Sequence, residues 1–277
     1  GVMMFSPSAT SPALSTLEDN DLFFRTSPSD ARQGQVIAEL LQEKGIKSIA
    51  MTYTNNDYGK GLADAIQSNY EAAGGKVTIN AAHEDGKGDY SAEVAALSQA
   101  GGEILMVVGY LDQGGKGIIQ SSLDAGAFSN FFLPDAMIGE SLVKAIGPDL
   151  DGSIGTVPGT DSKGAEIYAE LATKDGFTAG PYSPEAYDAA ALTLLAMQAA
   201  NSADSNAAKA KVFEVANAPG TKILPGELAK GLQILKDGGD IDYVGATAVE
   251  LIRAGESAGS YREILVKDGK NTTVRYR

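Results

Sequence analysis

The chain has 277 residues, enough for two modest α/β lobes or one large one, and 43% hydrophobic with 21% charged residues is an ordinary globular composition. Its formal net charge of −14 is scattered along the chain, which disfavours nucleic acid and anionic lipid as partners, because both need clustered Lys and Arg. Cysteine is absent, which excludes disulfides, Cys-ligated zinc and thiol nucleophiles.

The first predicted element is a buried strand at residues 2–6, followed at once by Pro7 and the small polar run Ser8–Pro12. A lone strand at this position has no sheet before it to pair with, and the later part of the chain offers few strands. We therefore expect that part of a lobe lies upstream of Gly1 or that another chain completes it.

From Ser29 to residue 157 the sequence alternates between helix-like and strand-like segments. The strand starts recur fairly evenly along the chain, which predicts right-handed βαβ crossovers and a mostly parallel sheet with helices on both faces. The predicted helices are residues 30–44, 57–73, 90–99, 115–125 and 141–146, and the predicted strands are residues 46–54, 76–81, 103–108, 131–133 and 153–157.

The second half is richer in helices. Pro184 suits the first turn of a helix, and the alanine- and leucine-rich segment after it predicts a packed core helix. Asp268-Gly269 predicts a hairpin turn between two of the last strands. The predicted helices are residues 164–174, 184–200, 206–216 and 227–236, and the predicted strands are residues 246–251, 261–267 and 272–276.

Common catalytic and metal-binding patterns find little support. His83 is the one histidine, and we interpret it as a solvated loop residue, which leaves no Ser-His-Asp triad and too few zinc ligands. The glycine clusters at residues 58–61 and 114–117 match no phosphate-binding loop, so they indicate either a ligand edge or turns with positive φ. The pairs Asp149/Asp151 and Asp240/Asp242 each lie beside glycine, and we interpret them as turn or cap residues rather than as metal-binding or acid/base dyads.

Polar side chains gather at the carboxyl ends of predicted strands, where open parallel sheets bind ligands. Hydroxyls and backbone N–H groups there suit a carboxylate, a lone aspartate suits an ammonium, and tyrosines can enclose a cation or an apolar group. Together they predict a receptor for a zwitterion without a nucleophile and base pair. The candidate ligand-binding residues are Ser8, Thr10, Tyr58, Tyr110, Asp135 and Tyr182.

Several segments together resemble the leucine/isoleucine/valine-binding protein family, the type I periplasmic binding proteins, in order along nearly the whole chain. Phe5–Pro12 resembles its Ser-Pro-x-Ala-Thr-x-Pro segment, and Asp57-Tyr58-Gly59-x-Gly61 resembles its Asp-x-x-Tyr-Gly-x-Gly turn. Further similar segments are Phe24-Arg25-Thr26, Asp89-Tyr90-Ser91, Gly180-Pro181-Tyr182 leading into Tyr187-Asp188-Ala189, and Asp240–Gly245.

The resemblance implies two α/β lobes joined by a three-strand hinge, which close on a ligand between them. Lobe 1 would comprise residues 1–25 and 158–242, and lobe 2 residues 26–157 and 243–277. Ser8 and Thr10 would hold the ligand carboxylate, Tyr58 and Tyr110 would close over it, Asp135 would pair with its ammonium, and Tyr182 would wall the side-chain pocket. Many relatives carry glutamate where Asp135 stands, and relatives also take amides, urea or aromatic acids.

The resemblance also implies that roughly a hundred residues of βα units, at about 30 residues each, precede the matched region, so lobe 1 would be incomplete. The expected protein is a non-enzymatic solute-binding component of an ABC importer, periplasmic, with a membrane permease as partner and no cofactor or metal. Gly1–Phe5 lacks signal-peptide features. The alternatives are a sensory ligand-binding domain and a carboxylate-based small-molecule hydrolase.

Overall fold

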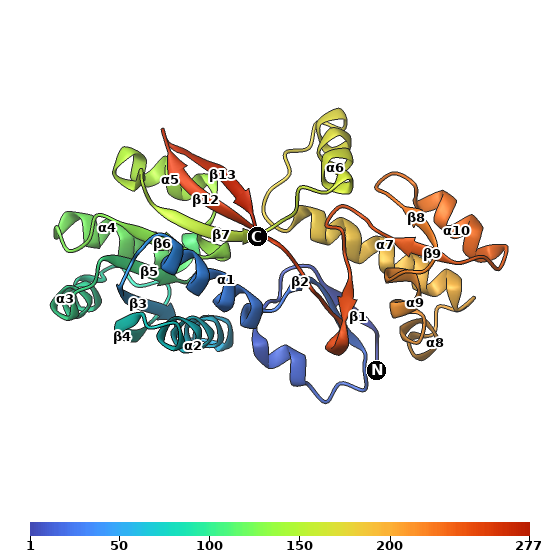
Figure 1. Ribbon diagram of the computed structural model, residues 1–277, viewed down its shortest axis with the longest axis horizontal. Helices are drawn as coiled ribbons and strands as arrows, with labels where there is room; N and C mark the ends of the chain where they lie inside the picture. Colours follow the sequence, from blue (N-terminus) through green and yellow to red (C-terminus); the bar gives the residue numbers. More distant parts are fainter. The chain divides into compact units, whose positions relative to one another are not determined.

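The computed structural model describes all residues 1–277, which divide into two units (Figure 1). Unit 1 contains residues 1–10, 14–29 and 158–260, and unit 2 contains residues 11–13, 30–157 and 261–277. Residues 243–260, which the sequence analysis assigned to lobe 2, lie in unit 1. None of the helices is long and apolar enough to cross a membrane.

Unit 2 is built on a seven-stranded sheet in the order β13-β12-β7-β6-β5-β3-β4, with parallel pairing from β4 through β3, β5 and β6 to β7 and an antiparallel hairpin at β12–β13. The predicted mostly parallel sheet flanked by helices is confirmed. Its strands are β3 (Ser48–Thr54), β4 (Lys76–His83), β5 (Ile104–Val108), β6 (Phe131–Leu133), β7 (Ile154–Pro158), β12 (Tyr261–Lys267) and β13 (Lys270–Tyr276).

Helices cover both faces of this sheet because alternate strand residues point to opposite sides. In β5, Leu105 and Val107 pack in the core that contains α3, α4 and α5, whereas Ile104, Met106 and Val108 pack with α1 and α2. The helices are α1 (Asp30–Glu43), α2 (Asp57–Ala72), α3 (Ser91–Ala100), α4 (Lys116–Asp124) and α5 (Glu140–Ile146), with short helical turns η2 (Leu111–Gly115), η3 (Asp135–Met137) and η4 (Gly147–Leu150).

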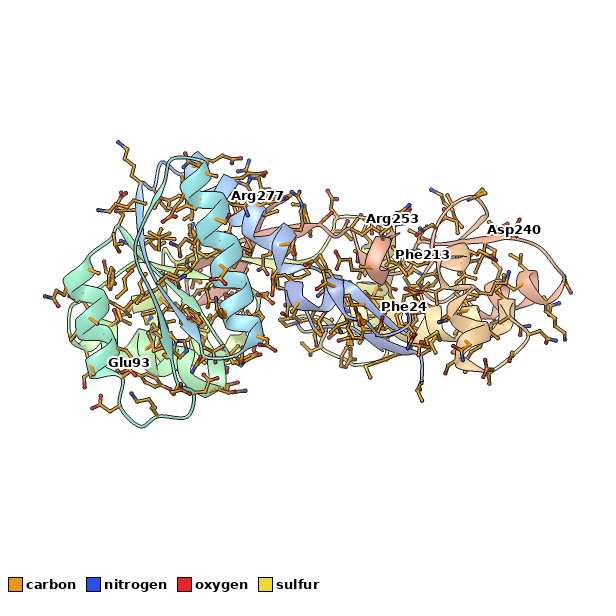
Figure 2. All side chains as sticks on the ribbon, turned by 90° about the horizontal axis from the view of Figure 1, so that it is seen from below. Phe24, Glu93, Phe213, Asp240, Arg253 and Arg277 are labelled. Carbon is orange, nitrogen blue, oxygen red and sulfur yellow. The ribbon has the colours of Figure 1, made fainter.

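The β12–β13 hairpin is tied to the end of α1 by a charge network around Glu263, which is 2% exposed. Glu263 accepts hydrogen bonds from Arg275 Nε at 2.8 Å and from Arg277 at 3.0 and 3.2 Å, and Lys44 Nζ lies 2.8 Å from its other oxygen (Figure 2 labels Arg277). Burial alone would raise the pKa of Glu263, but these cations outweigh it and lower the pKa to about 2.

We expect acid to weaken unit 2 through Glu263. Because its folded-state pKa lies below the unfolded value of 4.5, the stabilisation is fully present above pH 4.5 and is lost as the pH falls towards 2. Urea unfolding between pH 2.5 and 7 should show this loss, and Glu263→Gln should be less stable at pH 7 with a flatter profile below pH 4.5. If Glu263→Gln loses stability below pH 4.5 as steeply as the wild type, other carboxylates cause the loss.

Unit 1 has a four-stranded sheet in the order β1-β2-β11-β10 and a separate parallel pair, β8–β9. Its core packs α7 and α9 against Phe24 of β2 and against β8 and β9. The strands are β1 (Met4–Ser6), β2 (Phe23–Pro28), β8 (Thr221–Ile223), β9 (Ile241–Tyr243), β10 (Leu251–Ile252) and β11 (Glu256–Ser257). The helices are α6 (Lys163–Lys174), α7 (Ser183–Ala199), α8 (Ser205–Lys209), α9 (Val212–Ala216) and α10 (Leu228–Lys236), with the turns η1 (Pro12–Thr16) and η5 (Arg253–Gly255).

Three predicted elements of unit 1 are corrected. The buried strand at residues 2–6 is a three-residue edge strand, with Val2 79% and Met4 58% exposed. The single helix at residues 206–216 is two helices, α8 and α9, whose apolar residues both pack on α7. Most of the strand at residues 246–251 is a turn, because positive φ at Gly245 and Ala248 breaks the extended conformation.

Candidate functional site

Three of the six candidate residues come together at one edge of the sheet in unit 2. Tyr58 lies in the first turn of α2, Tyr110 follows β5, and Asp135 follows β6. The strands β3, β5 and β6 are neighbours and run parallel, so their carboxyl ends deliver these side chains to the same edge. The sequence predicted each residue from its strand end, and the structure brings them together.

The contacts among these residues are direct. The Tyr58 hydroxyl donates a hydrogen bond to Asp135 Oδ1 at 3.0 Å, and the rings of Tyr58 and Tyr110 have centroids 5.2 Å apart at an angle of 33°. Asp135 is 2% exposed, so its carboxylate lies under the aromatic pair rather than in bulk water. Two tyrosine rings beside a carboxylate combine aromatic faces and a negative charge, both of which attract cations.

Two residues that the sequence analysis did not single out contribute to this edge. Asn56 caps α2, accepting a hydrogen bond from the Gly59 amide at 2.9 Å, and its side chain also hydrogen-bonds Tyr110. Asp30, which is fully buried at the start of α1, acts electrostatically on both tyrosines. The capping signal of Asn56 was present in the sequence, whereas Asp30 becomes visible only once α1 is placed beside the sheet.

The tyrosines stay protonated over the whole physiological range. Burial is the largest cause, and the charges of Asp135 and Asp30 add to it, raising the pKa of Tyr58 well above 10. Burial also raises the pKa of Tyr110, against a lowering by its hydrogen bond with Asn56. Both hydroxyls are therefore donors, and the carboxylates dominate the charge of this edge.

The glycine clusters have a role other than the predicted positive φ. Gly59 and Gly115 have ordinary backbone angles, but a Cβ at Gly59 would lie 2.1 Å from the Thr54 carbonyl oxygen. A Cβ at Gly115 would lie 2.2 Å from Met137 Sδ. The turn interpretation is therefore wrong for these positions, where glycine allows α2 to pack close to the end of β3 and η2 to pack against η3.

The other three candidates lie in unit 1. Ser8 is exposed and Thr10 is 3% exposed, and both belong to the loop after β1. This loop is fixed by Ser6 Oγ, which accepts from the Ala9 amide at 3.0 Å, and by the buried Arg25, which donates to the Ala9 carbonyl at 3.0 Å. Glu256 holds Arg25 in turn, at 2.5 Å. The loop that carries Ser8 and Thr10 is thus held in place by the sheet residues Arg25 and Glu256.

Tyr182 precedes α7 with a left-handed backbone, φ 64° and ψ 4°. This conformation costs a non-glycine residue about 1 kcal/mol or more, so the surrounding structure must hold it there. Strained residues of this kind cluster at functional sites. The geometry is consistent with a role for the Tyr182 ring, which the sequence placed at this helix start.

Comparisons with known proteins give the family. The sequence profile described as "Periplasmic binding protein" matches residues 1–224. The chain belongs to the periplasmic binding protein family. This periplasmic binding protein is 33% identical over 213 residues to the Leu/Ile/Val-binding protein homolog 1 of Brucella melitensis, an alignment covering 74% of this chain and 55% of that protein. The chain spans only 55–59% of the length of the first curated relatives it matches.

Solved periplasmic binding proteins share the fold. A leucine binding protein from Thermotoga maritima superposes with a TM-score of 0.82 at 18% identity, covering 99% of this chain and 72% of that one. A solute binding protein of an ABC transporter from Rhodopseudomonas palustris, in complex with p-hydroxybenzoic acid, gives a TM-score of 0.77 at 18% identity, covering 100% and 72%. The predicted type I fold is confirmed.

Proposed function

We propose that this protein is the extracytoplasmic solute-binding component of an ABC importer and captures a small amino acid or a related amine. The observation that carries this proposal is the buried Asp135 beneath the Tyr58–Tyr110 pair in unit 2. The two units would act as lobes that close on the ligand, with Ser8, Thr10 and Tyr182 contributed by unit 1. The closed form would dock on a membrane permease.

Asp135 favours a ligand with a positive charge. A buried carboxylate is costly unless a cation or hydrogen bonds compensate for it, and Tyr58 supplies one donor. An ammonium beside Asp135 would pair with its negative charge, while the tyrosine faces enclose the rest of the group. The named ligands of the relatives include leucine and p-hydroxybenzoic acid, and this carboxylate favours the amine-bearing class.

The rival proposal of a hydrolase lacks support at this edge. Tyr58 donates to Asp135 but has a raised pKa, so it is a poor nucleophile. The only histidine lies at the end of β4 and contacts Thr52, not Asp135. The arrangement recognises charge and shape without an activated nucleophile, as expected for a receptor.

A thermal-shift screen tests the ligand class. Leucine, alaninamide and benzoate separate the requirement for an ammonium from that for a carboxylate. A ligand at a hundred times its dissociation constant adds about 2.7 kcal/mol of stability, and we expect a shift with both amines and none with benzoate. A shift with benzoate alone would contradict the assignment to amines, and no shift from a folded sample would contradict solute binding by this chain.

We further propose that additional βα segments complete unit 1 next to β1. The edge strand β1 pairs only with β2, so its other side has free backbone groups, and Val2 and Met4 are exposed beside it. The solved relatives are longer, since this chain covers 72% of their length. A further strand parallel to β1, followed by a helix, would bury this edge.

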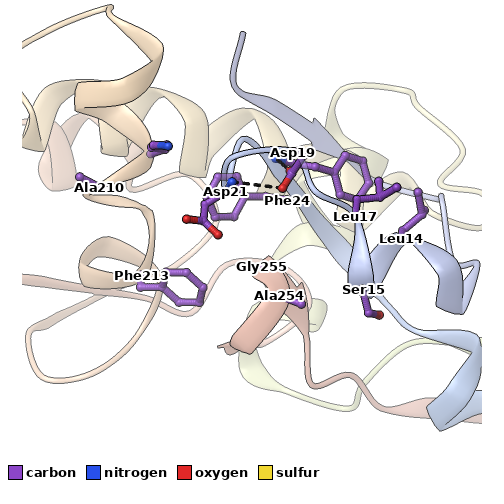
Figure 3. A pocket seen from close by; sticks show the side chains of 12 residues that line it. Leu14, Ser15, Leu17, Asp19, Asp21, Phe24, Ala210, Phe213, Ala254 and Gly255 are labelled. Carbon is purple, nitrogen blue, oxygen red and sulfur yellow. Dashed lines mark hydrogen bonds between the residues drawn. The ribbon is translucent and has the colours of Figure 1, made fainter. Parts of the chain in front are cut away.

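A separate pocket lies elsewhere in unit 1. Its volume is about 560 Å³, and its lining combines apolar side chains, among them Leu17, Phe24 and Phe213, with the charged Asp19, Asp21 and Lys209 (Figure 3). Phe213 and Leu17 are 40% and 49% exposed, although Phe213 meets Phe24 edge-on (Figure 2).

Hydrogen exchange tests this completion. We would co-express the chain with the remaining region of the Brucella relative, and the amides of β1 should then become protected, with a rise in melting temperature. Unchanged exchange at β1 despite co-purification would contradict pairing at this edge. Protection in the isolated chain that depends on its concentration would assign the edge to a second copy instead.

A further inference from the structure

The single histidine of the chain is buried, which corrects its interpretation as a solvated loop residue. His83 ends β4 and is 1% exposed. Its Nδ1 lies 2.9 Å from Thr52 Oγ1, and the Thr52 hydroxyl donates to the Ala81 carbonyl at 3.0 Å, so Nδ1–H is the donor in the contact with Thr52. Its Nε2 is buried and has no hydrogen-bond partner.

Acidic groups face this unpartnered nitrogen. Asp85 Oδ1 lies 3.8 Å from His83 Nε2 and is itself buried without a hydrogen bond, while Asp85 Oδ2 accepts from Thr54 Oγ1 at 2.5 Å. Glu84 and Glu93 add negative charge, Lys87 pairs with Glu93, and Tyr90 meets the imidazole edge-on at 6.3 Å. The site is therefore a buried imidazole whose unpartnered nitrogen lies just beyond hydrogen-bond distance of a carboxylate oxygen.

The turn that carries Tyr110 lies directly on this pair. A Cβ at Gly109 would lie 3.2 Å from His83 Nε2, and one at Gly114 would lie 2.7 Å from Asp85 Oδ1. The Tyr110 carbonyl accepts from the amides of Gln113, Gly114 and Gly115, which makes residues 109–115 one closed turn. Asp85 therefore lies against the turn after Tyr110, and His83 lies against the residue before it. The Gly86 amide also donates to the Gln113 carbonyl at 3.2 Å, so a movement of the His83–Asp85 pair is transmitted to the turn.

We propose that His83 and Asp85 are positioning residues for Tyr110, and that protonation of His83 shifts this turn and weakens ligand binding at the Tyr58–Tyr110–Asp135 edge. This inference rests on the proposed function for the identity of the ligand. It assigns a pH response to a pair of residues outside the six candidate contacts.

Protonation of His83 would act on Tyr110 through its effect on Asp85. Neutral His83 presents a lone pair to Asp85, so the two do not attract. Protonation makes Nε2 a charged donor, and a charged N–H···O hydrogen bond has a length of about 2.7–2.9 Å, roughly 1 Å shorter than the present gap. Closing that gap moves Asp85 from beneath Gly114. The turn then shifts, and the contact between the rings of Tyr110 and Tyr58 changes.

The direction of the pH response follows from burial. Burial lowers the pKa of His83 below 6.5 and outweighs the opposite effect of Asp85, Glu93 and Glu84. Protonation therefore begins only in mildly acidic solution, and ligand affinity should fall as the pH drops below about 6.5. By linkage, bound ligand should lower the pKa of His83 further.

The ligand-free protein gives the first test. Because His83 is the only histidine, its imidazole resonances report its titration without overlap, and fluorotyrosine labelling with Tyr110→Phe assigns the Tyr110 signal. We expect the Tyr110 signal to shift with the same midpoint as His83, and Asp85→Asn to abolish that shift. A Tyr110 signal that stays constant through the His83 titration would overturn the inference, whatever ligand the protein binds.

The affinity profile gives the second test, with leucine as the probe. The wild-type affinity should fall as the pH drops from 7.5 to 5, and the full change, reached once the pH lies below both pKa values, is about tenfold for a ligand that lowers the His83 pKa by one unit. His83→Gln should be nearly flat over that range, while Asp149→Asn, which removes an exposed carboxylate of unit 2 outside the 109–115 turn, should keep the wild-type profile. A His83→Gln profile as steep as the wild type would overturn the inference, and absence of leucine binding at every pH would count against the proposed function alone.

Discussion

Asp135→Asn is expected to weaken binding of an amine-bearing ligand by about 30-fold or more. Truncating one partner of a buried charge pair typically costs 2–5 kcal/mol, and each 1.4 kcal/mol is a factor of ten. The amide keeps the size of the side chain and an oxygen for the Tyr58 hydroxyl, so the loss would report charge rather than packing. Isothermal titration calorimetry with the ligand from the thermal-shift screen measures it directly.

The control for Asp135 is Asp149→Asn, which removes the same charge from an exposed position of unit 2 in η4. It should change the affinity by less than about threefold, because exposed charges are screened. Equal losses in the two variants would show that overall charge, and not the carboxylate under the tyrosines, attracts the ligand. An unchanged affinity in Asp135→Asn would contradict the proposed ammonium contact.

The largest stability effect is expected at Asp188, which is fully buried in α7. Its carboxylate accepts from the Tyr243 hydroxyl at 2.8 Å, from the amides of Ala246 and Thr247 at 2.8 Å, and from the Thr247 hydroxyl at 2.7 Å. Asp188→Ala leaves the buried Tyr243 hydroxyl and Ala246 amide without an acceptor, at about 1–3 kcal/mol each before relaxation, and also removes the acceptor of the partly buried Thr247. We expect a loss of about 3–5 kcal/mol in the free energy of unfolding of unit 1.

Chemical unfolding with hydrogen exchange would locate that loss. Protection should fall in α7 and in residues 241–247 of unit 1 and remain in the sheet of unit 2. Asp240→Ala is the matched control, because Asp240 is an exposed aspartate of the same unit (Figure 2). A loss below about 1 kcal/mol in Asp188→Ala would show that water replaces the carboxylate, contrary to the burial of this site.

Most of unit 2 could be predicted from the sequence because its strands and helices follow simple periodicities. Alternate residues of β3 and β5 pack into the hydrophobic cores on opposite faces of the sheet. Gly45 and Gly74 follow the ends of their helices with positive φ. The contacts of Tyr58 and Asp135 follow from the same regularity, since parallel strands place their carboxyl ends together. Local patterns were sufficient where the fold is regular.

The errors arose where tertiary contacts override local pattern. Residues 246–251 are apolar enough for a strand, but the Asp188 carboxylate captures the amides of Ala246 and Thr247 in a turn. His83 stands in a polar, glycine-rich stretch, yet its pairing with Thr52 on the neighbouring strand buries it. Neither partner is near in sequence, so no window along the chain reveals it.

The strand β5 has a consequence for handling the protein. Its residues Ile104–Val108 are uncharged and completely buried, because the sheet is covered on both faces. Before folding, this segment is a short, uncharged, β-prone stretch of the kind that pairs between chains. On the N-terminal side, Glu103 is the one charged residue next to this segment that would oppose pairing between chains. Its carboxylate accepts hydrogen bonds from the Lys47 and Ser48 amides only once β3 is in place. Yield on refolding should therefore fall steeply with protein concentration, and dilution rather than a change of salt should restore it.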